Sequence, residues 1–234
     1  MLDTLFFDFI HLAKKLQPKV VIAENVKGLI LGEAKTYVAR IYQELQEAGY
    51  EVRHFLLNAQ YMGVPQYRER VIFCALRRDL AKKFMEPYSL FGNRVAINMD
   101  DWDEPVIPLG EISDYQGYHW EHNSKMHELW SNRKMGDVNL AQANKRLYGS
   151  EAFFSQRLCY EDKVCPTLTS ESNGKLHFKE PCFLSNREIT YASTFPEDYD
   201  FMGHKAHYLC GMSVPPVMMA QIATRVWDQW LSKI

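Results

Sequence analysis

The spacing of apolar residues near the start of the chain is that of an amphipathic helix. Over residues 5–16 apolar side chains recur at intervals of three and four, and Pro18 follows, so the pattern predicts a helix that ends before this proline. Residues 34–48 show the same spacing and predict a second helix. Near the other end of the chain, Pro215 and Pro216 precede an apolar stripe and predict the start of a C-terminal helix.

Short apolar runs between these helices predict β-strands. Residues 20–23 are continuously apolar, as in a strand that is covered on both faces, and the residues from Glu24 to Gly28 are predicted to form a loop. Residues 51–57 and 70–76 predict two more strands. The order helix, strand, helix, strand, strand is typical of the last part of an open sheet, so the predicted fold class is α/β.

The middle of the chain lacks a regular hydrophobic period. Between Arg77 and about Asn186, aromatic and small polar residues mix with short apolar runs, and the runs at 106–109 and 167–169 predict short strands. We therefore expect a smaller, irregular second domain. The predicted domains are residues 1–78 with 187–234 for the α/β domain and residues 79–186 for the second domain.

The composition is that of an ordinary soluble chain. Of its 234 residues 47% are hydrophobic and 24% are charged, and the net charge of −2 gives no overall attraction to nucleic acid. The five cysteines include no C-x-x-C pair, which argues against a disulfide framework and a zinc site. Because the sequence contains neither a signal-peptide pattern nor an apolar run of about 20 residues, we expect a cytoplasmic protein without a membrane span.

Three histidines in the middle region do not predict a metal site. His127 begins the segment HELWS, which is similar to the zinc motif H-E-x-x-H, but Ser131 occupies the position of the second histidine. His119 and His122 complete no set of ligands, so the expectation is that the chain binds no metal.

Three segments contain the residues with candidate chemistry. They are Glu24-Asn25-Val26, the segment 58–73 (NAQYMGVPQYRERVIF) and the segment 210–223 (CGMSVPPVMMAQIA). In this order they resemble the sixth, eighth and tenth motifs of the DNA cytosine-5 methyltransferase family, and the segment 157–170 (RLCYEDKVCPTLTS) is similar to the ninth. The resemblance implies a Rossmann-like methyltransferase sheet that uses S-adenosylmethionine, together with a small target-recognition domain.

The resemblance assigns the role of a catalytic acid to Glu24. In this family a thiolate adds to carbon 6 of cytosine and pushes negative charge to ring nitrogen 3, where a carboxylic acid can protonate or hydrogen-bond it. Glu24 follows the predicted strand 20–23 and matches the family glutamate. The alternative for Glu24 alone is a solvated carboxylate at a strand end.

Arg68 and Arg70 match two family arginines that hold the cytosine carbonyl and neighbouring groups. A guanidinium suits this task because its fork of donors can hold an oxygen without losing its charge. Their spacing of two residues predicts that both side chains project from the same face of an extended segment. The alternative is a pair of ordinary surface arginines on either side of Glu69.

The resemblance also implies binding residues. In this family the tenth-motif turn touches the cofactor, which implicates Met212 and Ser213 in S-adenosylmethionine binding. The expected substrate is double-stranded DNA from which the target cytosine is turned out. Residues 125–146 mix basic with aromatic side chains and predict a DNA-facing surface, with a solvated helix face as the alternative. Further DNA-binding candidates are Gln66, Arg157, Thr167 and Thr169.

Two parts of the family pattern are not found in the sequence. The chain contains no G-x-G, which the cofactor loop of the family requires, and its one Pro-Cys pair, Pro181-Cys182, lacks the following glutamine of the nucleophile motif. We therefore expect the C-terminal part of a methyltransferase, inactive without a partner chain that supplies the loop and the cysteine. The sheet edge beside residues 19–23 is the expected place for this N-terminal subunit or for self-association.

Two other functions stay open. A catalytically inactive DNA-binding remnant of a prophage or of a restriction–modification system fits the missing loop and Met212, which stands where the family has asparagine. A tRNA-directed relative is less favoured, because the region between the eighth and ninth motifs is long enough to read a duplex.

Overall fold

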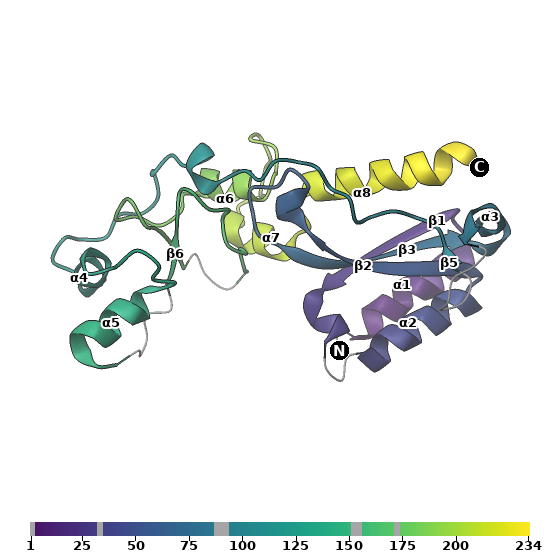
Figure 1. Ribbon diagram of the computed structural model, residues 1–234, viewed down its shortest axis with the longest axis horizontal. Helices are drawn as coiled ribbons and strands as arrows, with labels where there is room; N and C mark the ends of the chain where they lie inside the picture. Colours follow the sequence, from purple (N-terminus) through teal and green to yellow (C-terminus); the bar gives the residue numbers. More distant parts are fainter. Residues whose placement is uncertain (1–2, 32–34, 87–93, 151–155, 171–173) are drawn as a thin grey trace. The chain divides into compact units, whose positions relative to one another are not determined.

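The chain folds into two compact units, which are described separately. The computed structural model describes residues 3–31, 35–86, 94–150, 156–170 and 174–234 (Figure 1). The first unit comprises residues 1–58, 69–102 and 221–234, and the second comprises residues 59–68 and 103–220. No helix among the described residues is long and apolar enough to span a membrane.

The first unit is built on a three-stranded sheet. Its strands are β1 (Val20–Val26), β2 (Tyr50–Asn58) and β3 (Glu69–Arg77), in the order β1–β3–β2, with β3 antiparallel to both neighbours. The central strand β3 is fully buried from Val71 to Leu76. Its nearly continuous apolar sequence is therefore explained by cover on both faces.

Helices cover both faces of this sheet. Figure 1 shows α1 (Asp3–Leu16) and α2 (Lys35–Glu47) on one face and α8 (Pro216–Gln229), which enters this unit at residue 221, on the other. Ile10 of α1 and Leu45 of α2 are almost completely buried in one core with the sheet. The unit also contains η1 (Lys27–Ile30), α3 (Arg78–Ala81), η4 (Lys82–Phe84), β4 (Met85–Glu86), β5 (Arg94–Val95) and η6 (Leu231–Lys233).

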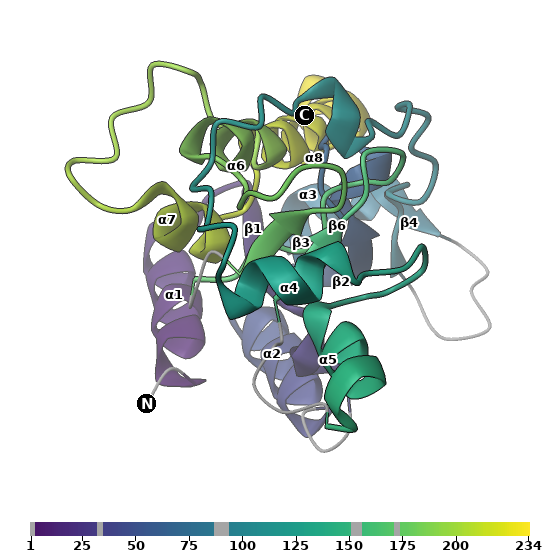
Figure 2. The ribbon, with the colours of Figure 1, turned by 90° about the vertical axis from the view of Figure 1, so that its left-hand side faces the viewer.

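The second unit consists of short elements joined by long connections. The parallel strands β6 (Arg157–Cys159) and β7 (Lys175–His177) form a small ladder, and α4 and α5 lie side by side next to it (Figure 2). Its helices are η3 (Ala59–Tyr61), η5 (Leu109–Glu111), α4 (Lys125–Ser131), α5 (Leu140–Tyr148), α6 (Asn186–Ala192) and α7 (Ala206–Met212).

Local sequence signals fix the starts of two of these helices. α6 begins with a capping box, in which Ser185 and Glu188 each accept a backbone N–H of the other. α5 begins with the corresponding box of Asn139 and Gln142 and ends at Gly149, whose φ of 73° is in the left-handed region. These caps hold short helices that would be marginal by themselves.

The three predicted helices and the strands predicted at 51–57 and 70–76 are confirmed to within two residues, but three other predictions are wrong. Glu24 does not lie in a loop, because β1 continues to Val26 through backbone pairing with β3. No strand forms at 106–109 or at 167–169. At 167–169 the backbone instead bonds to side chains, since Leu168 N donates to Gln66 Oε1 at 3.3 Å. The functional division at residues 79 and 186 stays a prediction.

Candidate active site

Glu24 and Arg70 lie together on neighbouring strands of the first unit. In the β1–β3 register Glu24 is opposite Ile72 and Arg70 is opposite Val26, so the two residues are diagonal neighbours on the same face. Arg70 Nε donates to Glu24 Oε1 at 2.6 Å. The side chain of Glu24 is 30% exposed and that of Arg70 is 10% exposed, so solvent reaches the pair mainly at the carboxylate.

The surroundings of Arg70 keep this pair in place. Burial lowers the pKa of Arg70, while the charge of Glu24 and the hydrogen bond to it act in the opposite direction. Arg70 remains a cation at neutral pH because a guanidinium has so high an ordinary pKa. Beside the pair, Lys27 Nζ lies 2.8 Å from Glu69 Oε2.

This geometry suits proton transfer at one defined point. A carboxyl group that is partly exposed and oriented by a cation can give or take a proton where a ligand meets it. The register of two strands sets the position of Glu24, and groups placed on strands are held more accurately than groups on loops.

Arg68 occupies a different environment from Arg70. It precedes β3, belongs to the second unit and is completely buried. Its Nη2 donates to the carbonyls of Gly211 at 2.8 Å and Ser213 at 2.5 Å, and its Nη1 donates to the carbonyl of Leu168 at 3.0 Å. Arg68 lies one residue before the strand that holds Arg70, and its described hydrogen bonds differ from those of Arg70, so a shared face stays a prediction. A contact between Arg68 and cytosine stays a prediction.

Gln66 is also buried among backbone groups of the second unit. Its amide donates to the carbonyl of Ala192 at 3.1 Å and to Ser193 Oγ at 3.3 Å. Thr167 Oγ1 donates to the carbonyl of Tyr67 at 2.7 Å. Gln66 and Thr167 thus connect segments of the unit, whereas Arg157 and Thr169 are exposed. DNA binding by these four residues remains a prediction.

The tenth-motif turn is held by its backbone. A Cβ added to Gly211 would lie 2.3 Å from the carbonyl carbon of Thr169, so only glycine allows this close approach of the two segments. Ser213 Oγ donates to the carbonyl of Cys210 at 3.0 Å. Met212 is 53% exposed. The side chain at position 212 is therefore not what sets the shape of the turn.

Three basic residues in the stretch 125–146 have partners within the unit. The contacts are Arg133 over the ring of Trp130 at 3.3 Å, Arg146 with Asp137 at 2.6 Å, and Lys125 with Glu128 at 2.8 Å. These contacts compensate part of the charge that a DNA-facing surface would need, and such a surface in this stretch remains a prediction.

Comparison with known proteins decides the family. The family model of the C-5 cytosine-specific DNA methylases matches residues 2–227. The chain belongs to this family. Type II methyltransferase M.FnuDI of Fusobacterium nucleatum is 44% identical to it, over 98% of this chain and 70% of that protein. Type II methyltransferase M1.HphI of Haemophilus parahaemolyticus is 29% identical, over 95% of this chain and 60% of that protein.

A solved structure shares the methylase fold. It is described as a DNA modification methyltransferase encoded within a prophage of E. coli, and it matches 97% of this chain and 74% of its own chain with a TM-score of 0.64 at 16% identity. This likeness supports the mixed α/β fold alone.

The family match corrects the recognition made from the motifs. The chain was expected to resemble only the C-terminal part of a methyltransferase through its sixth, eighth, ninth and tenth motifs. That description is wrong, because the family model matches nearly the whole chain and the relatives align over 95% of it or more. The chain spans 60% of the length of M1.HphI and 70% of the length of M.FnuDI.

The cysteines of this methylase chain are not placed as nucleophiles. All five are buried. Burial raises the pKa of Cys74, Cys165 and Cys182 to about 12 and also raises the pKa of Cys159 and Cys210. Because the thiolate is the reactive form of cysteine, the 234 residues offer no activated thiol.

Two features of the methylase chain were missed by the sequence analysis. The hydrogen bonds of Arg68 have no sequence signal, because their acceptors are backbone carbonyls far along the chain. A hollow lined by residues between 186 and 207 does have a weak signal, since Tyr199 and Phe201 are followed closely by His204, Lys205 and His207.

Proposed function

We propose that the chain takes part in transferring a methyl group from S-adenosylmethionine to carbon 5 of a cytosine in double-stranded DNA. The ion pair of Glu24 and Arg70 carries the proposal, because it holds an oriented and partly exposed carboxyl group on a sheet. Membership of the methylase family supports the reaction class.

In this proposal Glu24 exchanges a proton with the cytosine ring. When a thiolate adds to carbon 6, negative charge develops at ring nitrogen 3, and Glu24 gives its proton to that nitrogen. Arg70 then stabilises the carboxylate that is left. Once carbon 5 carries the methyl group, a base such as water takes the proton from carbon 5. The electrons of that C–H bond re-form the 5,6 double bond as the thiolate leaves carbon 6, and the proton on nitrogen 3 returns to Glu24.

The tenth-motif turn does not by itself fit the cofactor. Its carbonyls at Gly211 and Ser213 accept from Arg68, and Ser213 Oγ donates to Cys210. Met212 offers an exposed apolar side chain. The turn can therefore supply a packing surface for S-adenosylmethionine, and the polar contacts must come from other residues.

The thiolate and the remaining cofactor contacts come, in this proposal, from polypeptide outside these 234 residues. The burial of all five cysteines supports this requirement. One flank of the first unit suits such a segment, because β1 pairs on one side only among the described strands. The same flank can also join two copies of the chain. Along α1 it exposes the apolar row Leu5, Phe9, Leu12 and Leu16, at 61%, 40%, 52% and 70%.

A methyl-transfer assay tests the proposal. The chain is mixed with duplex DNA and labelled S-adenosylmethionine, with and without the part of M.FnuDI that lies outside the matched region. Label is expected in DNA only when both polypeptides are present. Glu24→Gln should then lower turnover by about 10²- to 10⁴-fold. Glu51→Gln removes a carboxylate that pairs with Arg78 at 2.8 Å and should leave turnover unchanged.

The outcomes separate the parts of the proposal. Methyl transfer by the chain alone would contradict a thiolate supplied from outside, and full turnover of Glu24→Gln would contradict the acid role. DNA binding without methyl transfer in any mixture would favour the second candidate, a DNA-binding protein without catalysis, to which the burial of the cysteines also points.

A further inference from the structure

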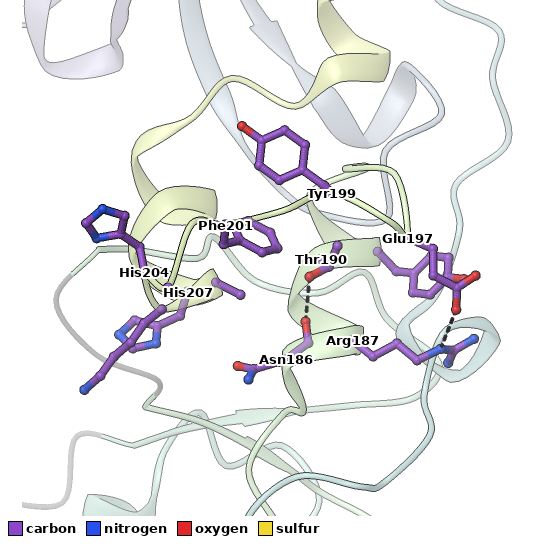
Figure 3. A pocket seen from close by; sticks show the side chains of 12 residues that line it. Asn186, Arg187, Thr190, Glu197, Tyr199, Phe201, His204 and His207 are labelled. Atoms are coloured by element: carbon purple, nitrogen blue, oxygen red, sulfur yellow. Dashed lines mark hydrogen bonds and ion pairs between the residues drawn. The ribbon is translucent and has the colours of Figure 1, made fainter.

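The second unit contains a pocket to which the proposed reaction assigns no role. It has a volume of about 720 Å³ and lies between α6, α7 and the segment that connects them (Figure 3). Residues from Asn186 to His207 line it. Its lining combines one lysine, one arginine and two histidines with aromatic rings.

Nitrogen-bearing side chains without internal partners, one of them a lysine, gather at the start of α7. They are His204, Lys205 and His207, and no hydrogen bond or ion pair to these side chains is found in the described part of the chain. Figure 3 shows His204 and His207 on the same side of the pocket. Because the charge of Lys205 is uncompensated and imidazole rings can donate N–H groups, this side suits an anion.

An aromatic wall stands beside these side chains. Tyr199 is 45% exposed, and its ring lies 4.8 Å from Phe195 and 5.0 Å from Phe201 in edge-to-face geometry. Phe195 and Phe201 pack against a buried core of the unit. The exposed ring of Tyr199 is thus held in place from behind and offers a surface on which a sugar or a base can rest.

The opposite side of the pocket has no net positive charge. Arg187 lies 3.8 Å from Glu197 and 3.6 Å from Asp114, and its guanidinium covers the ring of Tyr191 at 4.5 Å. These carboxylates compensate Arg187. The uncompensated positive charge is therefore confined to the side formed by residues 204–207.

The pocket adjoins a segment that is predicted to contact DNA. His207 and Gly211 are one helical turn apart on α7, and the backbone of Gly211 is packed against Thr169 and Ser170. A DNA strand that contacts Thr169 would continue along the same helix toward the pocket.

We propose that this pocket binds a backbone phosphate of DNA. Lys205, His204 and His207 face the phosphate, and Tyr199 contacts the neighbouring sugar or base. The inference rests on the proposed function, since it takes duplex DNA as the polymer. It adds a contact outside the cytosine site that raises affinity and sets the position of the chain without reading sequence.

The salt dependence of DNA binding tests the inference. The 234-residue chain is titrated into a short labelled duplex at several salt concentrations, and binding is followed by fluorescence anisotropy. If Lys205 neutralises one phosphate, Lys205→Ala should reduce the slope of log K against log[salt] by about 0.9. Between about 50 and 200 mM salt, the affinity of the variant should then fall by a factor about 3.5-fold smaller than the factor for the parent chain. Lys83→Ala, an exposed lysine of η4, is the matched control and should keep the parent slope.

A second variant changes the binding in the opposite direction. Glu197→Gln removes an exposed carboxylate from the pocket and should strengthen DNA binding at low salt. Inorganic phosphate at equal ionic strength should compete only weakly if the pocket selects a DNA strand, and strong competition would overturn that choice of ligand. Circular dichroism checks that each variant is folded.

The outcomes distinguish this inference from the proposed function. Equal slopes for Lys205→Ala and the parent chain would overturn the pocket and leave the methyl-transfer proposal unaffected. Lysine-dependent DNA binding, with no methyl transfer even in the two-polypeptide mixture, would support the pocket and contradict the reaction. A parent chain that binds no duplex would overturn the pocket, and the two-polypeptide methyl-transfer assay would then test the reaction separately.

Discussion

At the residue scale, Arg68 is a buried cation that connects three segments of the second unit. Its guanidinium reaches the carbonyls of Leu168, Gly211 and Ser213. Arg68→Met would leave these acceptors without their donor, and each buried unsatisfied group costs about 1–3 kcal/mol. We therefore expect the free energy of unfolding to fall by about 3 kcal/mol or more, measured by urea denaturation.

A matched variant separates the loss of the carbonyl contacts of Arg68 from the general effect of replacing an arginine by methionine. Arg157 is exposed in the same unit, so Arg157→Met should change the free energy of unfolding by no more than about 0.5 kcal/mol. Similar unfolding midpoints for the two variants would show that the carbonyl contacts of Arg68 do not stabilise the unit.

The candidate site was only partly predictable at this scale. Motif spacing identified Glu24 and Arg70 as candidates, but it treated Arg70 as the equal of Arg68. What distinguishes the two arginines is the strand register, which places Arg70 diagonally from Glu24. Register depends on a partner strand that lies more than forty residues further along the chain, which local pattern does not include.

At the element scale, the spacing of apolar residues predicted two kinds of element. These are helices that bury one face and strands that are apolar along their whole length. α1, α2 and β3 were found because their apolar positions repeat regularly. The extension of β1 through Glu24 was missed, since a charged residue at the end of an apolar run normally indicates a loop. Pairing with β3 overrides that local preference.

A buried carboxylate next to α5 predicts how stability depends on pH. Hydrogen bonding to Arg146 is the main cause that lowers the pKa of Asp137, and burial acts against it. Because the folded pKa lies below the unfolded value, the stabilisation is present above about pH 4 and is lost as pH falls through the folded pKa. Asp137→Asn should therefore cost about 2 kcal/mol at neutral pH, the scale of a hydrogen bond to a charged group.

The pH series supplies its own control. Urea midpoints of the parent chain and of Asp137→Asn are expected to approach each other as the pH falls below about 4 and to converge below the folded pKa of Asp137, where the parent aspartate is protonated too. A difference between the two urea midpoints that stays constant down to the lowest pH would mean that the charge of Asp137 does not stabilise the fold.

At the scale of the whole molecule, the short motifs and the complete chain lead to different conclusions about how much of a methylase is present. The four short motif segments, taken alone, indicate only part of an enzyme. The family model also weighs the weakly patterned residues between them and matches residues 2–227. Those residues form a unit of short elements joined by long connections, which has no regular period for a local reading to detect.

The distribution of the cysteines gives a prediction for the whole molecule. They lie in both units and are all buried, and burial raises the pKa of each thiol. A thiol reagent should therefore label none of the five in the native chain within minutes, and all five in urea, as counted by mass spectrometry. One fast-reacting cysteine in the native chain would identify an activated thiolate within these 234 residues and remove the need for a nucleophile from outside. Repeating the labelling with DNA and S-adenosylmethionine present tests whether the ligands expose such a thiol, and continued protection would locate the nucleophile on another polypeptide segment.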